Sequence, residues 1–424
     1  TITNSLGDIT SVDYTFDALN RLQSVTDAAG ITSYGYDAVG NRTSVSYPNG
    51  SSEVYAYDAL NRLSRKETFD GVGALVQRYD YTLHATGRRT QIDELDARST
   101  AYVYDTLYRL SSKIITDPTN GNYSASYQYD KVGNRLESLV DGVTTAYSYD
   151  LNDRLQQQGG TTYTYDDNGS TLTETLDGNA ITYAYNAKNQ LIGREAGLVS
   201  NSFAYNPDGI RVEKSEDGVT TRFLVDSNRD YAQVLVEVED NVLTAAYTYG
   251  DDLVSQTRGA DTSFYHYDGL GSVRGLSDGA GSLDSTYDYE AFGQVLSQTG
   301  STENDYQFAA EQFDSNLNQY YLRARYYNQG IGRFTQQDTW MGNNLDPITL
   351  HKYLYANNSP ANIIDPSGHF GIVGALHTIS VAGSLATAGT VGFQFGSLLD
   401  RIARTGDVPT TQNATALATI GAEL

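Results

Sequence analysis

Tyrosine residues alternate with smaller residues in short runs over the first two-thirds of the chain. An aromatic ring stands at every second position in runs such as 55–57, 102–104 and 147–149. Successive side chains of a β-strand point to opposite faces of its sheet, so this spacing sends both rings of a run to one face. The pattern predicts strands whose tyrosine-bearing face is the packing surface of a sheet.

Each run ends in the residues of a tight turn. An Asp follows the second ring, and Asn-Arg-Leu or a relative comes a few residues later, as at 20–22 and 61–63. The Asp can accept hydrogen bonds from N–H groups two residues on, while Asn61 or a Gly at that place can adopt the left-handed conformation of a short hairpin loop. We expect the Arg to pair with the loop Asp. A second turn, Asp-x-x-Gly as at 27–30, completes the unit.

The unit recurs mostly every 20 or 21 residues, which is typical of repeat architectures. We therefore expect an all-β fold, with antiparallel hairpins over residues 10 to about 300. Asp-rich loops also suit calcium, and tyrosine ladders suit sugar rings; the spacing does not match known calcium loops, and we favour structural turns and packing. The aligned aromatic residues are Phe16, Tyr36, Tyr57, Tyr104, Tyr129, Tyr149, Tyr165, Tyr185, Tyr205 and Tyr267.

The amino-acid composition disfavours several kinds of partner and site. The chain has 424 residues with 35 Tyr, 40 Gly and 7 Pro, a mixture that suits strands and tight turns. Its 52 acidic and 28 basic residues give a net charge of −24, which disfavours a nucleic-acid partner. Cysteine is absent and five histidines are scattered, so we predict no cofactor and no metal site. No signal peptide opens the chain, and we expect it to begin inside a longer polypeptide.

A denser sequence replaces the repeat from about residue 301. Its landmarks are Tyr-Tyr-Leu-Arg-Ala-Arg-Tyr-Tyr at 320–327, Gly-Arg-Phe at 332–334, and a stretch from 353 that ends in Asp-Pro-Ser-Gly at 365–368. Past residue 368 the composition changes again, because 370–399 contain no Asp, Glu, Lys or Arg. We expect a short apolar α-helical segment there. It either inserts into a membrane or lies inside the protein, straight or bent as a helical hairpin.

The repeated Y-x-Y-D-x-x-G-N-R unit resembles the YD repeat of the RHS (rearrangement hotspot) family, and residues 301–368 resemble the RHS-repeat-associated core domain. The family includes polymorphic bacterial toxins, C-terminal subunits of insecticidal Tc toxins, and animal teneurins. The resemblance implies a β-ribbon, here of one or two turns, that spirals into a hollow shell or tube closed by a plug. It divides the chain into a shell (1–300), a plug (301–368) and a variable region (369–424).

In toxin members of the family this core is an intramolecular aspartyl protease that cuts just after the D-P-x-G motif. The resemblance places the two carboxylates at Asp338 and Asp365, a companion arginine at Arg325, and the cut at His369-Phe370. Two carboxyls that share one proton can act as base on a water and as acid on the peptide carbonyl. The alternative from the residues alone is that both Asp residues belong to ordinary turns.

Two functions follow from these expectations. The first is the C-terminal part of a secreted or cell-surface bacterial RHS toxin, whose shell encloses a C-terminal toxin segment and releases it by a single self-cleavage; an immunity or delivery protein is then a further partner. The alternative is a non-enzymatic YD-repeat subunit that pairs with further copies of itself into an extracellular tube, filament or adhesion surface. Membrane contact through 370–399 is compatible with both.

Overall fold

The structure is a computed structural model and describes residues 11–373. Within this range 28 strands form one sheet, and each strand pairs antiparallel with the next strand along the chain, from β1 with β2 to β27 with β28. The expectation of antiparallel hairpins up to about residue 300 is confirmed, and so is the all-β fold class.

The strands of this sheet are β1 (Asp13–Phe16), β2 (Leu22–Asp27), β3 (Gly30–Tyr36), β4 (Arg42–Ser46), β5 (Ser52–Tyr57), β6 (Leu63–Phe69), β7 (Leu75–Leu83), β8 (Arg89–Glu94), β9 (Ser99–Tyr104), β10 (Leu110–Thr116), β11 (Tyr123–Tyr129), β12 (Arg135–Val140), β13 (Val143–Tyr149), β14 (Leu155–Gln158), β15 (Thr161–Tyr165), β16 (Thr171–Leu176), β17 (Asn179–Tyr185), β18 (Leu191–Ala196), β19 (Val199–Tyr205), β20 (Arg211–Glu216), β21 (Val219–Asp226), β22 (Gln233–Glu239), β23 (Val242–Tyr249), β24 (Leu253–Arg258), β25 (Asp261–Tyr267), β26 (Val273–Ser277), β27 (Leu283–Tyr289) and β28 (Val295–Thr299).

The two rings of a Tyr-x-Tyr run have different surroundings in many strands, whereas both rings are buried in β23, β25 and β27. In β11 the first ring, Tyr127, is buried, the intervening Gln128 is exposed, and the second ring, Tyr129, is half-buried. A β-bulge shifts the strand pairing between Gln128 and Tyr129. The Tyr129 hydroxyl then donates a 2.8 Å hydrogen bond to the carbonyl of Leu110, at the start of β10. The corresponding hydroxyls of Tyr36, Tyr57, Tyr104, Tyr149, Tyr205, Tyr267 and Tyr289 make the same kind of contact.

The turns have the predicted chemistry. In the β5–β6 turn, Oδ1 of Asp58 accepts hydrogen bonds from the N–H groups of Leu60 (2.8 Å) and Arg62 (3.0 Å). The Arg62 side chain returns to Asp58 Oδ2, with Nε at 2.7 Å. Asn61 has a φ of 58°, in the left-handed region. The Asp and Arg side chains of the repeat therefore satisfy the turn itself.

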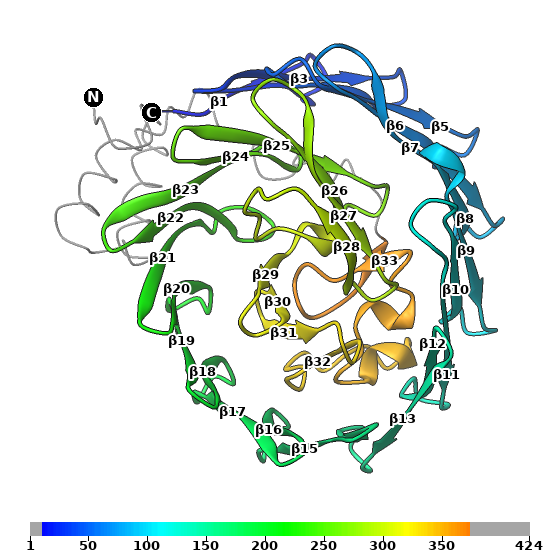
Figure 1. Ribbon diagram of the computed structural model, residues 1–424, viewed down its shortest axis with the longest axis vertical. Helices are drawn as coiled ribbons and strands as arrows, with labels where there is room; N and C mark the ends of the chain where they lie inside the picture. Colours follow the sequence, from blue (N-terminus) through cyan, green and yellow to red (C-terminus); the bar gives the residue numbers. More distant parts are fainter. Residues whose placement is uncertain (1–10, 374–424) are drawn as a thin grey trace.

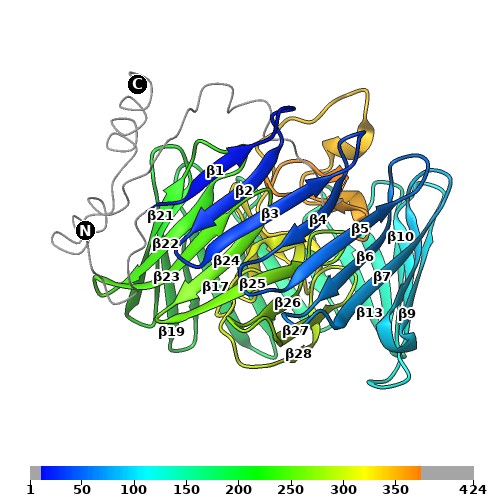
Figure 2. The same cartoon turned by 90° about the horizontal axis from the view of Figure 1, so that it is seen from above.

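The ribbon curls into a ring and overlaps its own beginning (Figures 1 and 2). Strands β23 to β27 lie against the outer strands β1 to β10, and side chains join the two layers. Tyr47 donates a 3.0 Å hydrogen bond to the carbonyl of Tyr265, and the Lys113 ammonium donates a 2.7 Å bond to the carbonyl of Tyr289. The expected shell is thus a ribbon of a little more than one turn.

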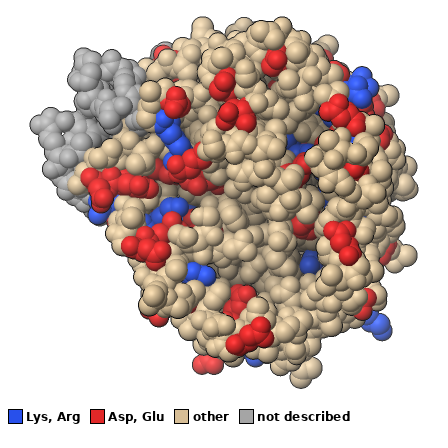
Figure 3. Space-filling view, viewed as in Figure 1, with Lys and Arg blue, Asp and Glu red and all other residues tan. Residues whose placement is uncertain are grey.

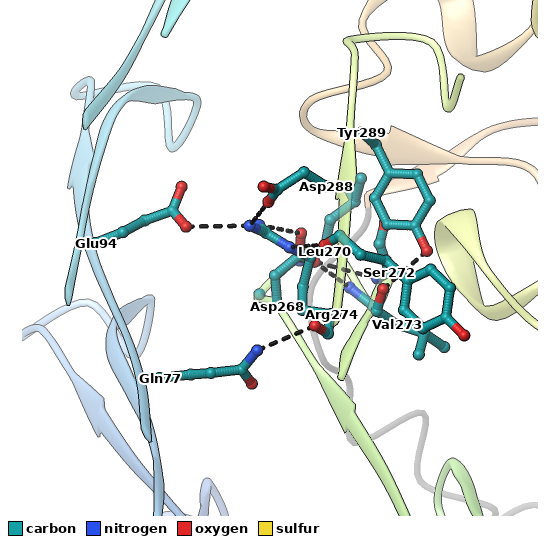
Figure 4. Close-up of polar contacts among 12 residues, drawn as sticks. Gln77, Glu94, Asp268, Leu270, Ser272, Val273, Arg274, Asp288 and Tyr289 are labelled. Atoms are coloured by element: carbon teal, nitrogen blue, oxygen red, sulfur yellow. Dashed lines mark hydrogen bonds and ion pairs between the residues drawn. The ribbon is translucent and has the colours of Figure 1, made fainter. Parts of the chain in front are cut away.

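Half-buried charged side chains pair at the seam between these layers. Arg274 on β26 contacts Glu94 of the outer strand β8 at 3.0 Å and also pairs with Asp288 on β27 (Figure 4). Gln77 on β7 donates a 3.0 Å hydrogen bond to the carbonyl of Arg274. These contacts connect residues about 180 to 200 positions apart and fix how far the ribbon curls.

The described residues after β28, up to residue 373, lie inside the ring (Figure 1). They form a small sheet of β29 (Gln312–Asp314), β30 (Gln319–Leu322), β31 (Arg325–Asn328) and β32 (Arg333–Phe334), and a two-stranded sheet of β33 (Ile363–Ile364) and β34 (Ile372–Val373). Short 3-10 turns are η1 (Leu95–Ala97) in the ring and η2 (Phe308–Ala310), η3 (Pro347–Leu350) and η4 (Ala356–Asn358) inside it. We call residues 301–373 the plug.

The plug is bonded to the ring by buried side chains. Its aromatic residues Tyr320, Tyr327 and Tyr355 belong to the same hydrophobic core as ring residues such as Tyr289. On the opposite wall Arg211 of β20 pairs with Asp314 of β29, and both are almost completely buried.

The expected apolar helix over 370–399 falls largely outside the described residues. Its first described part is a correction: residues 372 and 373 form β34, because they pair with β33 instead of starting a helix. Among residues 11–373, no helix is long and apolar enough to cross a bilayer.

Candidate active site in the plug

The three side chains assigned from the core motif converge in the plug from separate segments. Arg325 opens β31, Asp338 follows β32, and Asp365 follows β33 directly. The Nη2 atom of Arg325 lies 3.0 Å from Oδ2 of Asp338 and 3.7 Å from Oδ2 of Asp365. All three side chains are buried, so one guanidinium holds two carboxylates away from bulk water.

Arg325 is also fixed by its other contacts. Its Nη1 donates a 2.9 Å hydrogen bond to the carbonyl of Lys352, and its Nε donates to the carbonyl of Gly368. The guanidinium carbon lies 3.6 Å from the ring centre of Phe334, a cation–π distance. Burial lowers the pKa of Arg325 to about 10, which leaves the side chain positively charged at neutral pH.

Asp365 faces the backbone of the predicted cleavage site. Its Oδ1 accepts hydrogen bonds from the N–H groups of His369 and Phe370, both at 3.1 Å, and from the Ser367 hydroxyl at 3.0 Å. Burial raises the pKa of Asp365 above that of an ordinary Asp, although Arg325 and these hydrogen bonds oppose the shift. This carboxyl therefore holds a proton more readily than one in water.

Asp338 contacts the side chain of the predicted cleavage site. Nδ1 of His369 lies 2.7 Å from Asp338 Oδ1, which also accepts a 2.8 Å hydrogen bond from the N–H of Trp340. The Phe370 ring packs on Trp340 with ring centres 5.9 Å apart. Thus residues 369 and 370 lie against both carboxylates in the folded chain.

The carboxylates have space for solvent beside them. A cavity of about 340 Å³ is lined by Asp338, Asp365, His369 and Phe370, among others. A second cavity of about 230 Å³ reaches Arg325 and His369 from another side. At about 30 Å³ per water, either cavity holds several water molecules. Within residues 11–373, no group of three or more His, Asp or Glu side chains is arranged to hold a metal ion.

The structure thus brings together all five residues assigned from the sequence: Arg325, Asp338, Asp365, His369 and Phe370. Two contacts of the site were not expected. The His369 side chain touches Asp338, and Arg323 in the same Arg-Ala-Arg motif donates a hydrogen bond to the carbonyl of Pro366. The Arg-Ala-Arg motif pointed to the Arg323 contact, because it has two arginines and only Arg325 was given a role from the sequence.

A known family and known proteins match most of this chain in sequence. The sequence model of the teneurin YD-shell matches residues 79–361, and that of the RHS repeat matches 16–52 and 36–72. The tRNA3(Ser)-specific nuclease WapA of Bacillus spizizenii is 32% identical over 368 residues, which is 84% of this chain and 15% of the relative. The double-stranded DNA deaminase toxin A of Burkholderia cenocepacia is 26% identical over 212 residues, 41% of this chain and 14% of that protein.

Solved structures share the fold. The Photorhabdus luminescens Tc holotoxin pore has a TM-score of 0.66 at 18% identity, covering 86% of this chain and 22% of that chain. The TcdB2-TccC3 structure without its hypervariable C-terminal region has a TM-score of 0.64 at 18% identity, with 84% and 21% covered. The chain therefore spans about a fifth or less of the length of these relatives.

Proposed function

The chain belongs to the teneurin YD-shell family of RHS-repeat proteins, and from this membership we propose that it is the C-terminal part of a bacterial toxin whose shell encloses a toxin segment and frees it by cutting its own chain after Asp-Pro-Ser-Gly. The same proposal gives the chain three regions, a shell (1–300), a self-cleaving core domain (301–368) that makes up most of the plug, and a variable region (369–424). It places the protein outside the cell or on the cell surface, with the toxin segment and an immunity or delivery protein as partners.

The observation that carries the proposal is the position of the His369-Phe370 peptide. Its nitrogen, which would leave in the reaction, donates a hydrogen bond to Asp365 at 3.1 Å. The side chain on the other side of the bond lies 2.7 Å from Asp338. Hydrogen bonds from N–H groups to an Asp carboxyl also occur in the repeat turns, as at Asp58, but turn chemistry does not require a second carboxyl from a separate segment beside the same peptide.

The geometry supports a division of labour between the carboxyls. Asp338, whose Oδ2 lies 3.0 Å from Nη2 of Arg325, takes a proton from a water as the water oxygen bonds to the His369 carbonyl carbon. Asp365, whose pKa burial raises, gives its proton to the carbonyl oxygen. When the C–N bond breaks, the Phe370 nitrogen takes the proton that Asp338 gained from the water, and one hydroxyl of the diol returns its proton to Asp365. The two chain ends are then a carboxyl group and an amine, and both aspartates are back in their starting forms.

Intact-mass measurement of the purified chain tests this proposal. We expect two fragments that meet between His369 and Phe370, and full-length chain for Asp338→Asn and for Asp365→Asn. Asp346→Asn is the matched control, because Asp346 is an exposed residue that lines the same 340 Å³ cavity. A single mass that spans Gly368 in the unmodified chain would contradict the proposal.

One feature favours the alternative of a structural subunit. The turns from odd to even strands lie on one rim of the meander, and in five of the earlier turns the residue two places after the Asp is an exposed aliphatic: Leu19, Val39, Leu60, Leu107 and Val132. In later turns of the same rim the corresponding Leu270 and Phe292 are buried. Stacking of copies through this rim would bury the exposed row as well.

Charge opposes such stacking. Acidic side chains are spread over the face in Figure 3, and a net charge of −24 makes copies repel one another. Sedimentation velocity at low and high salt decides between the toxin and the structural subunit. Regular assemblies that Leu60→Asp abolishes would support the structural subunit, and a monomer at every salt concentration would exclude it.

A further inference from the structure

The residues just before the predicted cut are held by three consecutive residues, two of them in a hairpin turn and the third at the start of the next strand. The turn between β30 and β31 is Arg323-Ala324. Arg323 Nη1 donates a 2.5 Å hydrogen bond to the carbonyl of Pro366, and the N–H of Ala324 donates to the carbonyl of Ser367 at 3.4 Å. Arg325 Nε donates to the carbonyl of Gly368. Residues 366, 367 and 368 are therefore bound in order by 323, 324 and 325.

This contact is close enough to exclude a side chain. Gly368 has a φ of +71°, and a Cβ atom there would approach the Leu322 carbonyl oxygen at a distance that atoms do not tolerate. The Asp-Pro-Ser-Gly loop is thus pressed against the turn along its backbone.

Arg323 has an unusual backbone conformation and three further partners. Its φ is +59°, in the left-handed region that residues other than glycine adopt infrequently. Its Nη1 lies 2.7 Å from Oε2 of the buried Glu311 in the plug. Its Nε donates a 3.1 Å hydrogen bond to the carbonyl of Ala232, and its guanidinium carbon lies 5.5 Å from the ring centre of Tyr231.

Tyr231 and Ala232 belong to the ring, in the segment between β21 and β22. One guanidinium therefore joins the ring wall, the plug and the loop that carries the predicted cut. Its partner Glu311 keeps the side chain oriented, since a charge-assisted hydrogen bond between a half-buried guanidinium and a buried carboxylate restricts both groups.

We infer that Arg323 is a positioning residue for the proposed self-cleavage, which holds the Asp-Pro-Ser-Gly loop for the reaction and ties that hold to the ring wall at Tyr231 and Ala232. The inference rests on the proposed function. Its consequence is regulatory: the scissile peptide reaches Asp338 and Asp365 in register only when the wall has closed on the plug. Displacing the reacting groups by about 1 Å can slow an oriented reaction roughly 100-fold. Loss of the contact between Arg323 and Pro366, three residues before His369, is therefore expected to lower the cleavage rate.

The test follows the cleavage of newly made full chain during cell-free synthesis, by pulse-chase on denaturing gels and by fragment mass. We expect Arg323→Gln to slow cleavage roughly 10- to 100-fold and to add fragments that end beside residue 369. Arg323→Lys should recover most of the rate and the single end, because an ammonium reaches both Glu311 and a carbonyl. Tyr231→Ala should slow the reaction less than Arg323→Gln does.

Arg62→Gln is the matched control and should leave rate and product unchanged. Arg62 also joins a carboxylate, Asp58, to a main-chain carbonyl, that of His84, but it lies in a repeat turn of the ring. Parent rate and a single product end for Arg323→Gln would overturn the inference, even while Asp365→Asn still abolishes cleavage and so upholds the proposed function. If Arg323→Gln fails to fold, equal rates for Arg323→Lys, Tyr231→Ala and the parent overturn it instead.

Discussion

Aspartate residues of this chain titrate in opposite directions according to their surroundings. In the repeat turns, the hydrogen bonds from Arg21 lower the pKa of Asp17, and those from Arg62 lower the pKa of Asp58. In the plug, burial raises the pKa of Asp365. The turn aspartates are therefore anions that hold backbone N–H groups, whereas Asp365 is suited to hold and give a proton.

The pH dependence of self-cleavage follows from this contrast. An acid catalyst works in its protonated form, so we expect the rate to fall as the pH rises through the raised pKa of Asp365, above the usual value of about 3.9. Newly made chain diluted into buffers from pH 4 to 9 gives the profile. A rate that increases throughout this range would show that Asp365 is not the acid; Asp346→Asn should keep the parent profile.

From the sequence, only the site residues that belong to a family motif could be predicted. Arg325, Asp338 and Asp365 come from the family motif and meet in the structure. The hold of Arg323 on Pro366 depends on the path of the β30–β31 turn and on a ring segment some 90 residues earlier in the chain. A local sequence pattern does not reveal which residues so far apart in the chain come into contact.

At the scale of the hairpin, the decisive feature is the bulge before the second tyrosine. Period-2 alternation predicts that Tyr127 and Tyr129 share a face, but gives both rings the same surroundings. The bulge gives the two tyrosines different contacts. The Tyr127 ring is buried, whereas the Tyr129 hydroxyl donates a hydrogen bond to the Leu110 carbonyl of the preceding unit. The register of a neighbouring strand decides this, and a single run of residues does not reveal it.

We expect Tyr129→Phe to destabilise the ring by about 1 kcal/mol, because it removes one hydrogen bond to a carbonyl and keeps the ring. Tyr108→Phe is the control, since Tyr108 is exposed at a turn. Urea unfolding followed by circular dichroism measures both. Equal midpoints for the two variants would mean that these hydroxyls do not contribute to the stability of the repeat.

Another element-scale prediction concerns the contact between turns of the two layers. The N–H of Gly71 donates a 2.9 Å hydrogen bond to the carbonyl of Gly281, and a Cβ on Gly71 would lie 2.5 Å from the carbonyl oxygen of Ala280. We expect Gly71→Ala to push the layers apart and destabilise the protein by about 1–3 kcal/mol. Gly279→Ala, in the facing turn, meets no atom within 4 Å and should have little effect.

Hydrogen exchange at residues 278–282 localises the change. Faster exchange in Gly71→Ala than in Gly279→Ala is the expected result. Unchanged exchange together with a lowered thermal midpoint would place the damage elsewhere in the hairpin.

At the scale of the whole molecule, the seam between the layers is polar as well as aromatic. Arg42 on β4 faces two carboxylates that precede β24, with Nη1 at 2.7 Å from Asp252 and 3.7 Å from Asp251. Burial raises the pKa of Asp251 to about 6, because one guanidinium does not fully compensate two carboxylates. These partners are about 210 residues apart, so the repeat pattern predicts the ribbon but not the place where it closes on itself.

This seam gives a pH-dependent stability. Because the pKa of Asp251 is higher in the folded chain than in the unfolded chain, its stabilising protonation is complete at low pH and is lost as the pH rises through about 6. Asp251→Asn should therefore match the parent near pH 4 and exceed it at pH 8, by roughly 1–3 kcal/mol. Thermal unfolding across this range measures the difference. Asp240→Asn, in an exposed turn, should follow the parent at every pH, and a constant offset for Asp251→Asn would contradict the titration.

The pairing of every strand with its sequence neighbour sets an order of events during synthesis. A hairpin of this ribbon needs only residues that have just left the ribosome, so the wall can form step by step at the pace of translation. The overlap of the layers requires residues beyond 245, and the contact of Arg325 with Asp365 requires the last part of the plug. Among the described residues, the proposed cutting site is therefore the last part to assemble, so self-cleavage cannot begin before the ring around the plug has been synthesised.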